Sequence, residues 1–98
     1  MIRVVVQDET GNEVSEAVDV STALLAHPDD VRFACLRFVD PYGDTIFNRL
    51  QLPPLLDDLR LLRQCGNGSE DEAALRQVEA LIERCRAEPH LYLRLIGD

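Results

Sequence analysis

The spacing of the hydrophobic residues changes twice along this chain, and that change restricts the possible folds more than any other feature. Residues 2–7 form a β-branched run and residues 90–96 alternate between apolar and polar side chains, both of which are typical of β-strands. Between them, residues 53–88 carry apolar side chains three and four positions apart, the repeat of an amphipathic helix. The chain therefore combines strands at both ends with helices in the middle.

The helical stretch divides into two. Pro53-Pro54 suits the first turn of a helix, where a missing N–H is not needed, and leucines follow at helical spacing. Glycines near residues 66–68 are expected to end this helix, and a second apolar stripe then runs to Cys85. Pro89 is expected to end the second helix.

Three further strand signals precede the helices. Turn residues at 8–13 separate the first strand from an apolar pattern at 14–20, which predicts a hairpin. Residues 31–39 are apolar on both faces and predict a central strand covered on both sides, and 45–47 predict a short returning strand. We expect one α+β domain spanning residues 1–98, with a small, mostly antiparallel sheet of about four to five strands packed by two α-helices, in the order β-β-β-β-α-α-β.

The chain is acidic and contains no lysine. Its net charge is −8, all ten basic residues are arginines, and residues 1–30 hold Arg3 alone against seven acidic residues, a net charge of −6. Reactions that need a Schiff-base lysine or a Walker-type lysine are thereby excluded. The negative field repels nucleic acids and anionic membranes and favours a basic protein partner; the alternative is that it serves solubility alone.

The cysteines and the amino terminus favour a cytoplasmic protein without a metal site. Cys35, Cys65 and Cys85 are odd in number and widely spaced, which argues against a secreted disulfide framework and predicts reduced core thiols. Cys85 and His90 are the only near pair of metal-ligand types, so we expect no metal and no cofactor. No segment reads as a signal peptide or membrane span.

The densest group of polar side chains lies in residues 40–51. Its candidate interaction residues are Asp40, Tyr42, Asp44, Asn48 and Arg49. Carboxylate and amide oxygens at this density suit a recognition loop or a weak hard-cation site. A structural interpretation is favoured, because Asp at the first position, Pro at the second and Gly at the fourth are what a type I turn requires.

Two blocks of the chain resemble a group of small uncharacterised bacterial proteins. The blocks are residues 42–51, YGDTIFNRLQ, and the closing stretch of 88–93, EPHLYL, with Gly97-Asp98. The group has no established activity, so the resemblance implies a shared fold and no particular chemistry.

We expect a non-enzymatic protein-binding module, immunity-like or regulatory, whose acidic amino-terminal third engages a basic partner surface. One alternative is a small hydrolase or metal-dependent enzyme that uses Asp40, Asp44 and His90, which requires the three to converge on a pocket. Another is self-association through an edge strand.

Overall fold

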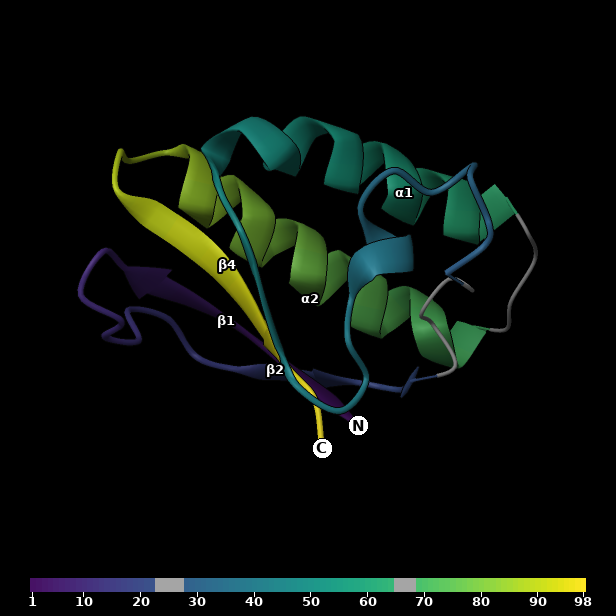
Figure 1. Cartoon of the computed structure of the whole chain (residues 1–98), viewed down its shortest axis with the longest axis horizontal. Coiled ribbons are helices and arrows are strands. Elements are labelled where there is room, and N and C mark those ends of the chain that lie inside the picture. Colours follow the sequence, from purple (N-terminus) through teal and green to yellow (C-terminus); the bar gives the residue numbers. More distant parts are fainter. Residues whose placement is uncertain (23–27, 65–68) are drawn as a thin grey trace.

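The computed structural model describes residues 1–22, 28–64 and 69–98. Four strands form one antiparallel sheet, with the helices packed on one of its faces (Figure 1). The elements follow in the order β1 (Ile2–Asp8), β2 (Val18–Val20), the 3-10 helix η2 (Leu36–Phe38), β3 (Asp44–Phe47), the 3-10 helix η3 (Arg49–Gln51), α1 (Leu52–Gln64), α2 (Ser69–Arg86) and β4 (Leu91–Ile96). The α+β fold class is confirmed.

The two terminal strands pair with each other at the centre of the sheet. The strand order is β2-β1-β4-β3, so β1 and β4 are the inner strands and β2 and β3 are the edges. Val4 lies opposite Leu95 and Val6 opposite Leu93 in the central pair. The apolar alternation at both ends of the sequence thus forms the middle of the sheet.

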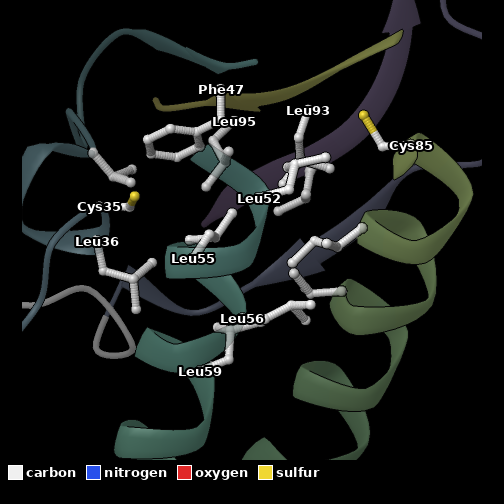
Figure 2. Packing of buried hydrophobic residues seen from close by; sticks show 14 of the residues in the cluster. Cys35, Leu36, Phe47, Leu52, Leu55, Leu56, Leu59, Cys85, Leu93 and Leu95 are labelled. Carbon is white, nitrogen blue, oxygen red and sulfur yellow. The ribbon is translucent and has the colours of Figure 1, made fainter. Parts of the chain in front are cut away.

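The core lies between the sheet and the helices. Leu52 and Leu55 of α1 pack in one buried cluster with Leu93 of β4, and Phe47 of β3 belongs to the same cluster (Figure 2). α2 contributes Ile82 and other apolar residues at helical spacing. Prolines at the second and third positions of α1 cost no hydrogen bond, because the first turn of a helix has no acceptor for those N–H groups.

The predicted strand over residues 31–39 is wrong. This segment is an irregular loop that contains η2, and the sheet has four strands in the order β-β-β-α-α-β. Val31 and Phe38 are 78% and 64% exposed, so the segment is not covered on both faces. The physical reason is Asp58 of α1, whose carboxylate accepts hydrogen bonds from the backbone N–H groups of the loop and thereby supplies the partners that a strand would take from a sheet.

The first hairpin is confirmed, with a shorter second strand than predicted. β2 covers only residues 18–20, because the chain leaves regular pairing after the bridge between Gln7 and Glu13. Val6 donates its N–H to the Ser15 hydroxyl at 3.0 Å and accepts from the Val14 N–H at 2.9 Å, so residues 13–17 follow β1 irregularly.

Candidate interaction surface

The turn at residues 40–43 forms as predicted. The Asp40 carbonyl accepts a hydrogen bond from the Gly43 N–H at 3.4 Å, and the Asp40 carboxylate accepts one from the Tyr42 N–H at 2.9 Å. The turn also meets the end of the chain, because Gly97 donates to the Gly43 carbonyl at 2.8 Å and Asp98 donates to the Pro41 carbonyl at 3.1 Å. Parts of the two sequence blocks are therefore neighbours in space, since Gly97 meets Gly43 and Leu93 lies opposite Phe47.

Two more candidates of this loop have partners within the chain. Asp44 forms an ion pair with Arg94 of β4. The Asn48 side chain accepts hydrogen bonds from the N–H groups of Leu50 and Gln51 and caps η3, while the Gln51 side chain accepts from the Asn48 N–H. These contacts assign structural roles to Asp44 and Asn48, as they do to Asp40.

The remaining two candidates point to solvent. Tyr42 is 83% exposed, and Arg49 is exposed in η3. Neither side chain forms a hydrogen bond or an ion pair with another residue in the described part of the chain. Of the five predicted interaction residues, Tyr42 and Arg49 are thus the two with uncommitted side chains.

The structure does not bring Asp40, Asp44 and His90 together. Asp44 lies opposite Ile96 at one end of β4, whereas His90 directly precedes Leu91 at the other end. Six residues of strand separate the two positions, which is roughly 20 Å. His90 lies instead 3.1 Å from the Glu9 carboxylate, measured from its Nδ1. Within residues 1–22, 28–64 and 69–98 there is no pocket and no group of three potential metal ligands.

The acidic amino-terminal segment retains carboxylates without a cation. Arg3 donates from both terminal nitrogens to Glu13, at 3.1 and 3.0 Å. The carboxylates of Glu16 and Asp19 are exposed and form no ion pair with the described residues. Asp8 serves the hairpin turn, where hydrogen bonds from the Thr10 hydroxyl and from the Asn12 backbone lower the pKa of its carboxyl.

In Figure 1, no helix of the described residues lies on the face of the sheet opposite α1 and α2. Its side chains come from alternate positions of the strands, since the other positions fill the core. The ion pairs Arg3–Glu13 and Arg94–Asp44 lie on this face, and Val5 between them is fully buried. Asp19 lies opposite Arg3 on the same face. We call this surface the open face.

Asp58 is the most highly coordinated polar side chain that the sequence analysis missed. It is 3% exposed, and its two oxygens accept from the N–H groups of Ala34, Cys35 and Leu36 at 3.1, 2.8 and 2.9 Å. A signal was present, because a carboxylate three positions after Leu55 and four before Leu62 falls on the apolar stripe of the helix.

The sequence analysis also missed where the exposed apolar side chains gather. Six large hydrophobic residues are exposed among the described residues, and four of them fall between positions 38 and 50: Phe38, Tyr42, Ile46 and Leu50. Ile46 lies in β3, at the edge of the sheet. Exposed large apolar side chains this close in sequence make the segment a candidate for an interaction site.

The described cysteines are free and buried, as predicted. Burial raises the pKa of the Cys35 thiol, and the neighbouring Asp58 carboxylate raises it further. Burial alone raises the pKa of the Cys85 thiol. The Cys35 thiol donates to the Gln51 carbonyl at 3.6 Å. Cys65 lies outside the described residues.

No family model, curated protein or solved structure matches this chain. Among the described residues, no helix has the length and hydrophobicity needed to cross a membrane.

Proposed function

We propose that this chain is a non-enzymatic protein-binding module that docks a basic partner through the carboxylates of its amino-terminal hairpin. The observation that carries the proposal is the charge of residues 1–30, which is −6. Within that segment the Arg3 guanidinium pairs with Glu13, while Glu16 and Asp19 are exposed and form no ion pair with the described residues. Unneutralised charge of one sign steers association with a partner of the opposite sign.

The polar side chains best suited to catalysis or metal binding support this proposal, because the contacts they make serve the fold. Asp40 and Asn48 hold turns, Asp44 pairs with Arg94, and Asp58 anchors a loop. Each of these side chains is explained by the fold, whereas Glu16 and Asp19 form no such contact with the described residues. The proposal includes a cytoplasmic location, with which free Cys35 and Cys85 agree.

The proposal is tested by capture with matched charge variants. The wild-type chain, the variant E16Q/D19N and the control D57N/E83Q are immobilised and exposed to extract of the native host. Both variants remove two exposed carboxylates, but Asp57 and Glu83 lie on the helices and pair with arginines three residues away. We expect a basic protein that is retained by the wild type and the control, and lost from E16Q/D19N. Equal retention by all three chains would contradict the proposal.

A further inference from the structure

We propose that β3 is a self-association edge, at which two copies of this chain pair antiparallel about a twofold axis and join their sheets. This inference is independent of the proposed function, because it concerns a different edge of the molecule and the purified chain alone. It starts from the hydrogen-bond phase of the sheet, by which we mean the alternation of residues whose backbone groups face one neighbouring strand or the other. This alternation determines which N–H and C=O groups of an edge strand face solvent.

The phase is fixed by contacts on both sides of the sheet. Gly97 donates to Gly43, so the alternating ladder continues with Thr45 bonded to Leu95 and Phe47 bonded to Leu93. By the same alternation the backbone groups of Leu95 and Leu93 face β3. Val6 of β1 lies opposite Leu93, so its backbone groups face away from β4. Val6 indeed bonds to Val14 and Ser15 on the β2 side.

The backbone groups of Asp44 and Ile46 consequently point away from the sheet. β3 pairs only with β4, and these N–H and C=O groups form no hydrogen bond within the described part of the chain. In Figure 1 the segment that contains β3 passes in front of β4, on the viewer's side of the sheet. Two successive outward residues offer two donors and two acceptors, which is the minimum for a short antiparallel ladder.

The edge lacks the features that usually block pairing. Asp44–Phe47 contains no proline, lysine or bulge, and Thr45, Ile46 and Phe47 all favour extended structure. The single charge, Asp44, is held by Arg94. The opposite edge differs, because β2 has three residues and Val18 and Val20 pair inward with β1, which leaves only Asp19 facing outward.

The charges beside β3 identify the occupant as a second copy. Asp40 precedes the strand and has no cation partner, while Arg49 follows it and has no anion partner among the described residues. Antiparallel pairing centred on Thr45 places Asp44 opposite Ile46 of the second copy. It also brings the Arg49 end of each strand to the Asp40–Gly43 turn of the other. The strand is thus self-complementary in charge, as a twofold interface requires.

The exposed apolar residues lie along the same edge. Ile46 is on the open face of β3, and Tyr42 and Leu50 lie on the segments before and after the strand. Pairing of two copies covers the flanks of both strands with these side chains. The proposed pairing gives a role to the exposed side chains of Tyr42, Ile46 and Leu50.

The test is sedimentation of the purified full chain over a wide concentration range at physiological ionic strength, where salt screens the repulsion between two acidic copies. We expect a reversible monomer–dimer equilibrium. I46P removes an outward N–H that the monomer does not use, and I46K places a charge at the interface without changing the backbone; each is expected to raise the dimer Kd at least about tenfold. V31K alters another exposed apolar residue, which lies outside β3, and is expected to leave the Kd within about twofold.

Amide hydrogen exchange gives a residue-level readout that does not depend on any variant. As the concentration rises, the N–H groups of Asp44 and Ile46 are expected to become protected, while those of Thr45 and Phe47 are already protected in the monomer. In the cycle formed by D40N, R49Q and their double variant, the double is expected to weaken the dimer no more than either single change. A chain that stays monomeric at every concentration, or a dimer unaffected by both I46P and I46K, would overturn the inference.

Discussion

The Asp58 carboxylate on α1 lies 2.8 Å from the backbone nitrogen of Cys35, a residue 23 positions earlier in the chain. Together with its bonds to Ala34 and Leu36, this contact satisfies three successive N–H groups at the start of η2. A buried carboxylate that accepts several backbone hydrogen bonds is expensive to remove, since the donors are then left buried and unpaired.

We therefore expect D58N to lose about 3 kcal/mol of unfolding free energy. The amide keeps one acceptor oxygen but turns an NH₂ group toward N–H donors that need an acceptor. Urea denaturation measures the loss. The neighbouring change D57N is the control, because Asp57 is exposed and pairs only with Arg60, so it is expected to change stability by no more than about 0.5 kcal/mol. Equal effects of the two variants would refute the role assigned to Asp58.

Asp58 also shows why one element could not be predicted from the sequence. The apolar pattern of residues 31–39 favours a strand, and nothing within that segment indicates otherwise. Its conformation is decided by a side chain from a helix more than 20 residues later, as the bonds to Ala34 and Cys35 show. Local patterns carry no information about such a contact.

The other elements were predictable because their signals are local. The spacing of Leu55, Leu59 and Leu62 defines α1, and the alternation of Leu91, Leu93 and Leu95 defines β4. The turn at 40–43 follows from residue types at fixed positions. The ion pair of Asp44 with Arg94 and the outward direction of the backbone groups of Asp44 and Ile46 depend on strand order and register, which the sequence does not specify.

Gly97 is expected to tolerate no side chain. A Cβ at this position would stand 2.5 Å from the carbonyl carbon and oxygen of Pro41, so the backbone itself would have to move. At Gly43 a Cβ would meet the Asp40 carboxylate at 2.8 Å, and a side chain can rotate away. We expect G97A to cost about 3 kcal/mol and G43A clearly less, measured by chemical denaturation. The reverse order would contradict the close packing of the chain end against the turn.

His90 is the only non-glycine residue in the described ranges with a positive φ, at 65°. That conformation is strained for a side chain other than glycine. Its contact with the Glu9 carboxylate is exposed and is worth little. We expect H90G to raise the unfolding free energy by about 1 kcal/mol relative to H90A, and E9Q to leave it nearly unchanged. Thermal melts of the three variants check this; H90A as stable as H90G would refute the strain.

The buried thiols predict a loss of stability at alkaline pH. The folded state holds the pKa of Cys35 and Cys85 above their ordinary value of 9.0. Between the ordinary and the raised value the unfolded chain has released these protons while the folded chain keeps them, so the free energy of unfolding falls as pH rises. The contribution of these two buried thiols to the free energy of unfolding is fully present below about pH 9 and is lost as the pH rises further. Denaturation midpoints on both sides of pH 9.0 are expected to fall less steeply in C35A/C85A than in the wild type, and parallel curves would contradict this.

The central claim, that the amino-terminal carboxylates dock a basic partner, is tested most directly by the association rate constant of the purified complex at increasing salt. The account predicts that this constant falls steeply with ionic strength for the wild type and much less for E16Q/D19N. A rate constant that is independent of salt, and equal for the two chains, would contradict it.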